Sequence, residues 1–297
     1  MNPATIAPSP VRALVNKVPE ITLGFWAIKV LATTVGETAA DYLNFNLGIG
    51  LTNTSLVLAA LFAVALAFQV RAQTLHQSLY WLVVVLVSVV GTLITDNLVD
   101  HLGVPLAVLT PIFAVALAAT FGVWYAQEKT LSMHHIDTPT REGWYWLAIL
   151  LTFALGTAAG DLAAETLKLG YLNSTLLFVA AIALVAVAHY VFRLGAVAAF
   201  WIAYVLTRPL GASFGDWLAQ PLASGGLGLG TTHTSLVFLG AILLLVATLA
   251  QAGCGARRRL TRREPNAPRA VRHGRPVCFV ESSCAPISRI TSCRTRR

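Results

Sequence analysis

Acidic side chains recur at fixed intervals in an otherwise apolar chain of 297 residues. The regularly spaced ones are Asp41, Asp96, Asp161 and Asp216. Each has a second oxygen-bearing side chain four residues away, respectively Glu37, Asp100, Glu165 and Gln220. Residues at this spacing share one face of a helix. Carboxylate oxygens are the ligands that hard divalent cations prefer, so the pattern is typical of a site for such ions or for protons.

A tryptophan and a glycine accompany each aspartate at constant distances. The Trp stands fifteen residues before the Asp, and the Gly follows the Trp by ten residues. These residues are Trp26, Gly36; Trp81, Gly91; Trp146, Gly156; Trp201, Gly211. Every Trp also follows an aromatic residue: Phe25, Tyr80, Tyr145 and Phe200. The intervals between successive Trp residues are 55, 65 and 55, which indicates a repeat that was duplicated twice.

The composition is that of a membrane protein. Hydrophobic residues make up 56% of the chain and charged residues only 11%, whereas soluble domains carry about 25% charged residues. Mean hydropathy is +0.70. The net charge of +8 belongs to the C-terminal tail, because residues 1–252 hold 9 Lys and Arg against 11 Asp and Glu. The basic balance therefore does not indicate a nucleic-acid-binding surface.

Each repeat contains two apolar segments separated by a turn. The first segments run about 21–43, 79–102, 143–167 and 196–219, and the second about 54–70, 105–125, 171–192 and 234–250. A helix needs about 20 residues to cross a bilayer. The sequence therefore predicts an all-α, polytopic transmembrane helix bundle with eight spans, arranged as four two-helix repeats.

The distribution of Lys and Arg predicts the orientation. The arm before the first span and the connections between repeats hold most basic residues: Arg12, Lys17, Arg71, Lys129, Arg141 and Arg193. The turns inside the repeats hold only Lys168. Because Lys and Arg concentrate on the cytoplasmic side, we expect both termini in the cytoplasm and the Trp residues in an aromatic belt at the cytoplasmic interface. All four repeats then enter the membrane in the same direction, as parallel repeats.

The chain resembles a family of bacterial integral membrane proteins built from four tandem two-helix repeats of unknown function. The resemblance rests on the repeated Trp, Gly and Asp and covers about residues 20–250. It implies the fold and a location in the bacterial inner membrane, and it supplies no activity or catalytic residues. The expected domains are an N-terminal arm (1–20), a transmembrane domain (21–252, with repeats at about 21–72, 77–128, 142–193 and 196–252) and a basic, disordered cytoplasmic tail (253–297).

The helical rise places the repeated residues at common depths. Ten residues correspond to roughly 15 Å and fifteen residues to roughly 22 Å of helix. In a hydrocarbon core of about 30 Å, the glycines lie near the midplane and the aspartates in the outer third. A charged residue at a helix centre costs about 2.5–3.5 kcal/mol on insertion scales. We therefore expect the acids to face the bundle interior or an outward-facing polar vestibule, and the midplane glycines to permit close helix packing.

Seven acids are candidates for binding the cation: Glu37, Asp41, Asp96, Asp100, Asp161, Glu165 and Asp216. The narrower metal-ligand set is Asp96, Asp161, Asp216 and His101, where the histidine would admit softer metals. Asp100 and Glu165 lie one turn further out and are the weaker candidates. No cofactor is indicated other than a bound divalent metal ion.

Two basic residues also fall within the predicted spans. Lys29 is three residues past Trp26, close enough to the interface for its ammonium to snorkel to the cytoplasm. Arg208 is seven residues past Trp201 and too deep for that. We expect Arg208 to be the counter-charge of a carboxylate, either Asp216 or Asp161.

Two functions compete. The first is a transporter of a small cation, either a divalent metal or protons, and its partners are the lipid bilayer and that cation. The alternative is a non-transporting scaffold or accessory subunit whose carboxylates only hold helices together. An enzyme is not expected, because no nucleophile motif occurs. The sequence leaves open whether the protein forms a homo-oligomer. The four cysteines all lie in the tail and fit no zinc pattern.

Overall fold

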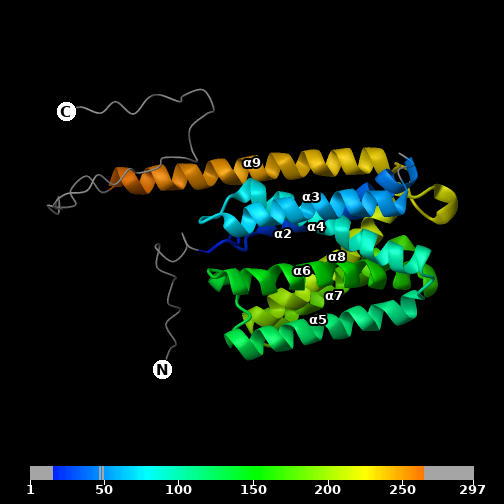
Figure 1. Cartoon of the computed structure of the whole chain (residues 1–297), viewed down its shortest axis with the longest axis horizontal. Coiled ribbons are helices and arrows are strands. Elements are labelled where there is room, and N and C mark those ends of the chain that lie inside the picture. The colour runs from blue at the N-terminus through cyan, green and yellow to red at the C-terminus, as the bar shows by residue number, and fades with distance from the viewer. Residues whose placement is uncertain (1–15, 47, 49, 264–297) are drawn as a thin grey trace. The chain divides into compact units, whose positions relative to one another are not determined.

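A computed structural model describes residues 16–46, 48 and 50–263. In these ranges every regular element is helical, and eight are long α-helices (Figure 1). Their bounds are α2 Leu23–Asp41, α3 Leu51–Arg71, α4 Gln77–Asp96, α5 Leu106–Glu128, α6 Pro139–Asp161, α7 Tyr171–Tyr190, α8 Ala196–Ala219 and α9 Thr231–Arg263. The all-α prediction is confirmed for this part of the chain.

Short helical turns complete the description. Three π-helical turns continue three of the first helices of the repeats: η1 Tyr42–Asn46 after α2, η2 Asn97–His101 after α4 and η4 Leu162–Thr166 after α6. Two 3-10 turns, η3 Met133–His135 and η5 Leu222–Ser224, lie in connections. The chain divides into two compact units, residues 1–246 and 247–297. Of the second unit, only the end of α9 is described. The predicted tail begins at residue 253, but residues 253–263 belong to α9, and residues 264–297 lie outside the described residues.

Seven helices are long and apolar enough to cross a membrane, namely α3 to α9. The eighth, α2, carries Lys29, Glu37 and Asp41 within 19 residues. These polar residues lower the hydropathy of α2. Its packing against α4 and α8 is nevertheless equivalent to that of the other first helices of the repeats. The structure thus supports a membrane-type helical protein with seven candidate spans among the described residues, one fewer than the eight that the sequence predicts.

The first helices of the four repeats form a closed inner ring. Helix α2 packs on α4, α4 on α6, α6 on α8, and α8 packs back on α2. The second helices lie outside this ring, each against the first helix of the following repeat: α3 on α4, α5 on α6 and α7 on α8. The fourth repeat closes the arrangement, because Ser235 of α9 donates a hydrogen bond of 2.8 Å to Thr38 of α2. The protein therefore has pseudo-fourfold symmetry.

Burial differs sharply between the two sets of helices. More than half of the apolar core of α4, α6 and α8 is buried, at 56%, 67% and 56%. The outer helices α3, α5, α7 and α9 bury only 17%, 22%, 11% and 17%. Exposed side chains on the outer helices are large and apolar, such as Leu56 and Val115, as expected for surfaces that face lipid.

The repeated aromatic pairs pack around the inner ring. The aromatic residue of each repeat contacts the Trp of the next, at ring-centroid distances of 5.4, 5.6, 6.1 and 5.7 Å: Phe25 with Trp81, Tyr80 with Trp146, Tyr145 with Trp201, and Phe200 with Trp26. Three of the four Trp residues are at most 5% exposed. These side chains therefore pack between the inner helices, whereas their predicted position at the cytoplasmic interface stays a prediction.

The midplane glycines allow the inner helices to touch. A Cβ on Gly36 would overlap Ser88, and one on Gly91 would overlap Phe153. In the same way Gly156 faces Arg208, and Gly211 faces Thr33 of the first repeat. Each glycine thus packs against a side chain of the next repeat, and that side chain belongs to the residue three positions before the next repeat's own glycine. The predicted role of these glycines in close packing is confirmed.

Candidate cation site

The cyclic packing brings equivalent positions of the four repeats to the pseudo-fourfold axis. The position three residues before the glycine holds Thr33, Ser88, Phe153 and Arg208. The position directly after it holds Glu37, Thr92, Thr157 and Ala212. Three repeats therefore place a side-chain oxygen near the axis from the residue that follows the glycine. The fourth repeat instead places the Arg208 guanidinium there, from three residues before its glycine.

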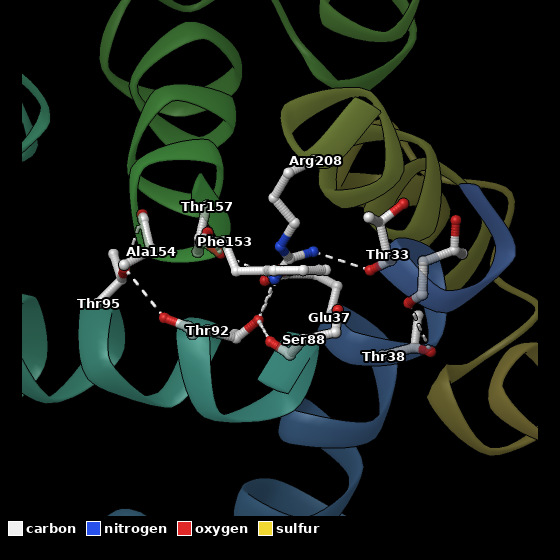
Figure 2. A network of polar contacts seen from close by, with 12 residues as sticks. Thr33, Glu37, Thr38, Ser88, Thr92, Thr95, Phe153, Ala154, Thr157 and Arg208 are labelled. Atoms are coloured by element: carbon white, nitrogen blue, oxygen red, sulfur yellow. Dashed lines mark hydrogen bonds and ion pairs between the residues drawn. The ribbon is translucent and has the colours of Figure 1, made fainter. Parts of the chain in front are cut away.

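Arg208 is fully buried at the centre of this network (Figure 2). Its Nη2 forms an ion pair of 2.9 Å with Glu37 Oε2. The same nitrogen donates to Thr157 Oγ1 at 2.8 Å and to Thr92 Oγ1. The other nitrogen, Nη1, donates to the Thr33 carbonyl at 2.8 Å. One Arg side chain thus connects all four inner helices.

The carboxylate partner of Arg208 differs from the prediction. We expected Asp216 or Asp161, but the structure pairs Arg208 with Glu37 of the first repeat. The physical reason is the packing order of the ring, in which α8 lies directly against α2. The expectation that Arg208 is a counter-charge to a carboxylate is retained, with a different acid.

Lys29 also departs from the prediction, because its side chain does not snorkel. Only 1% of the residue is exposed, and its Nζ lies 4.1 Å from the ring centroid of Phe153 and 4.2 Å from that of Tyr204. Within the described residues, Nζ has no hydrogen-bond partner. Helix α2 turns this face toward the axis, so the ammonium points into the bundle and makes cation–π contacts.

Beyond Arg208, acidic side chains gather at one level. Glu37, Asp161 and Asp216 each offer one carboxylate oxygen, and these three oxygens all lie within 4.8 Å of one another. The three residues come from α2, α6 and α8, which are consecutive around the ring. Glu37 and Asp216 are 5% and 7% exposed, and Asp161 is half-buried. Acids that are distant in sequence therefore converge at a single point.

Asp41 and Asp96 complete what we call the acid layer, which consists of Glu37, Asp41, Asp96, Asp161 and Asp216. Both Asp41 and Asp96 are half-buried and lie close enough to Glu37 for electrostatic repulsion. In the described part of the chain, the four aspartate carboxylates accept no hydrogen bond from a protein donor. Their oxygens are therefore available to a ligand, unlike Glu37 Oε2, which Arg208 and Thr92 hold.

The remaining predicted residues lie further out. Asp100, His101 and Glu165 are exposed and belong to the π-helical turns that follow α4 and α6. Glu165 accepts a hydrogen bond of 3.2 Å from Tyr171. Of the predicted metal set, Asp161 and Asp216 belong to the three-acid group, whereas Asp96 and His101 do not.

One feature of the site escaped the sequence analysis, namely the hydroxyls of Thr92 and Thr157, which bind Arg208. Glu37, in contrast, was among the predicted cation-binding acids and does belong to the three-acid group. Alignment of the four repeats would have revealed the two threonines, since each directly follows the repeated glycine. An apolar groove of about 740 Å³, lined by residues that include Phe121, Trp201 and Val205, lies apart from these acids and contains none of them.

Comparisons with known proteins agree with the repeat analysis. A repeat described as Repeat of Unknown Function (DUF347) matches residues 24–74, 79–130, 144–194 and 199–252. No curated protein and no solved structure matches the chain. Because the four matches together cover more than half of the sequence, the protein belongs to this repeat family, as its Trp, Gly and Asp pattern predicted.

Proposed function

We propose that this member of the four-repeat family transports a small, hard cation across the bacterial inner membrane, through the ring of α2, α4, α6 and α8. The observation that carries the proposal is the convergence of Glu37, Asp161 and Asp216, whose oxygens lie within 4.8 Å of one another between apolar helices. Intramembrane acids are costly, and they usually mark ion or proton pathways.

The spacing of the oxygens suits one metal ion. Hard divalent ions such as Mg²⁺ and Ca²⁺ hold oxygen ligands at about 2.0–2.6 Å, so ligands on opposite sides of an ion are about 4.0–5.2 Å apart. The three oxygens of the acid group lie within 4.8 Å of one another, which does not exceed the upper limit of this range, so all three fit around one ion. Asp41 and Asp96 would supply further oxygens at the same level, and Asp100 and Glu165 would attract cations at the mouth.

The chemistry of the donors favours hard ions over soft ones. The acid layer offers carboxylate oxygens, and the hydroxyls of Thr92 and Thr157 are nearby. His101 is exposed in η2 and lies outside the three-acid group. Oxygen-only sites suit Mg²⁺, Mn²⁺ and Ca²⁺, whereas softer metals prefer imidazole or thiolate ligands. We therefore propose a hard divalent cation as the substrate, with protons as the alternative cargo.

The buried cations give the site a second property. The five carboxylates of the acid layer outnumber the two buried cations of the bundle, Lys29 and Arg208, which leaves a formal charge of −3 when all are ionised. Such a surplus attracts a divalent ion. Arg208 is at the same time a fixed positive charge next to the site, so it would weaken binding enough for the ion to leave again. A transport site needs this compromise between entry and release.

The proposed topology has eight spans with both termini in the cytoplasm. Helix α2 supplies the eighth span, because it packs between α4 and α8 as a full member of the inner ring. Two of the polar residues that lower its hydropathy have partners inside the bundle: Glu37 pairs with Arg208, and Lys29 contacts the rings of Phe153 and Tyr204. This arrangement favours a transporter over an enzyme, although the Arg208 network would equally serve a scaffold that moves no ion.

Reconstitution distinguishes transport from a scaffold role. The full chain in sealed vesicles should carry Mn²⁺ down a gradient, detected by quenching of an enclosed dye, and Asp161→Asn combined with Asp216→Asn should abolish the flux. Asp137→Asn, an exposed aspartate in the connection before α6, is the matched control and should transport normally. Equal behaviour of wild type and the double variant, with no flux of Mn²⁺, Mg²⁺, Ca²⁺ or protons, would leave only the scaffold role.

A further inference from the structure

The end of the bundle opposite the acid layer also contains a buried carboxylate. Glu142 lies in the first turn of α6, nineteen residues before Asp161 on the same helix, which corresponds to roughly 28 Å of helix. Only 1% of Glu142 is exposed. Its Oε1 is buried and has no hydrogen-bond partner among the described residues. A buried carboxylate of this kind needs a cation nearby.

The cation that meets Glu142 comes from the N-terminal arm. Lys17 Nζ lies 2.6 Å from Glu142 Oε2, and it also donates a hydrogen bond of 2.9 Å to the Val70 carbonyl. Val70 is in the last turn of α3, where carbonyl groups lack helical partners and the helix end is partly negative. Next to it, both amide atoms of Gln69 are buried without a hydrogen-bond partner in the described chain.

The arm around Lys17 is packed into the protein. The backbone N–H of Lys17 donates to the Ile136 carbonyl at 3.3 Å. Val18, Met133 and Ile136 are 4%, 3% and 1% exposed. The side chain of Lys17 itself is 11% exposed. The ammonium is therefore held in place by a docked segment and does not reach Glu142 from a free tail.

From these contacts we infer that Glu142 and the Val70 carbonyl form a second cation site, which the ammonium of Lys17 occupies in this structure. The donors are a carboxylate and a backbone carbonyl, the same hard oxygen type as in the acid layer, so the ligand class is again a hard divalent cation. The arm then acts as a tethered competitor for this site. Any passage of a transported ion through this second site rests on the proposed transport function, whereas the binding of a cation there does not.

Equilibrium Mn²⁺ binding to the purified full chain tests the site directly. Lys17→Met keeps the apolar stem of the side chain and removes the ammonium, so this variant should bind one more Mn²⁺ per chain than wild type. Adding Glu142→Gln to Lys17→Met should remove that gain. Adding Asp161→Asn instead should leave the gain unchanged, which separates this site from the acid layer. The matched lysine control is Lys129→Met, an exposed residue after α5, which should bind as wild type does.

Limited trypsin digestion tests the docking of the arm without any metal. Glu142→Gln should speed cleavage after Lys17 at least tenfold relative to cleavage after the exposed Lys129, because the arm loses its anchor. Glu128→Gln, which breaks the partly exposed ion pair with Arg141 at 2.6 Å, is the matched control and should leave cleavage after Lys17 unchanged. This measurement remains decisive if Lys17→Met does not fold.

The proposal is overturned if Lys17→Met binds no more Mn²⁺ than wild type, or if the extra Mn²⁺ persists when Glu142→Gln is added. Unchanged trypsin cleavage in Glu142→Gln would likewise show that the ion pair does not hold the arm. If the gain appears in Lys17→Met while wild type carries no ion in vesicles, the second site stands and the transport function fails.

Discussion

Two neighbouring layers on the pseudo-fourfold axis differ in whether protein groups pair with their charged side chains. In the Arg208 network, the guanidinium binds Glu37, two threonine hydroxyls and the Thr33 carbonyl. In the acid layer, the four repeated aspartates accept no hydrogen bond from a described protein donor. In the first layer both terminal nitrogens of Arg208 are bound by protein oxygens, as in a structural network, whereas the second layer leaves oxygens for a ligand. Charges at similar depth can therefore serve stability in one layer and binding in the next.

The largest expected effect is the loss of the guanidinium. Arg208→Leu leaves Glu37 buried without its partner, and breaking one side of a buried ion pair costs about 3–5 kcal/mol. Thermal unfolding in detergent should show this loss of stability. Arg208→Leu combined with Glu37→Gln should recover part of it, because the second change removes the unpaired charge. A single Arg208→Leu variant as stable as wild type would contradict a structural role for this layer.

A smaller loss of stability is expected when one hydroxyl of the same network is removed. Thr157→Val keeps the shape of the side chain and deletes its bond to Arg208. Hydrogen bonds to charged groups contribute about 1.5–3 kcal/mol. The same unfolding measurement should detect this loss, and Thr157→Ser, which keeps the hydroxyl, should lie close to wild type. An equal effect of Val and Ser would mean that the hydroxyl is not the stabilising group.

The acid layer should respond in the opposite way. Asp161→Asn removes a charge from a cluster of mutually repelling acids, so we expect unfolding stability to stay equal or to rise. Mn²⁺ affinity should fall about tenfold, equivalent to about 1.4 kcal/mol, in a titration of the purified protein. A destabilised Asp161→Asn with unchanged affinity would erase the distinction between the two layers.

The smallest effect is expected for an ion pair of the same chemistry on the surface. Glu128 and Arg141 lie 2.6 Å apart, as close as any ion pair of the described chain, but their side chains are 20% and 23% exposed. Exposed pairs contribute about 0.2–1 kcal/mol. Glu128→Gln should therefore change unfolding stability far less than Arg208→Leu does. A comparable loss in both variants would show that burial does not set the contribution of the pair.

The repeat pattern predicted much of the fold because the first helix of each repeat carries the same residue types at the same spacing. Regular Trp, Gly and Asp spacing gave four equivalent repeats, and the glycines indicated close helix contacts. It did not predict which helices touch. The exchange of partners between repeats, with α3 on α4 rather than on α2, depends on long-range packing that no local pattern encodes.

The same limit explains the errors at the site. The depths of Asp161 and Asp216 follow from helical rise, so their common level was predictable, as was the position of Arg208 eight residues before Asp216 on the same helix. The partner of Arg208 was not, because Glu37 reaches it only through the closure of α8 onto α2. The snorkelling prediction for Lys29 was wrong for a similar reason, because distance along one helix does not determine which face of that helix meets Phe153.

The most direct test of the acid layer is to determine the structure of the full chain with Mn²⁺ and locate the ion by its anomalous scattering. Our account predicts an ion between Glu37, Asp161 and Asp216, with carboxylate oxygens at about 2.0–2.6 Å, the range for hard cations. A structure with Mn²⁺ present but absent from this position, and with the aspartates hydrogen-bonded to neighbouring helices instead, would contradict it.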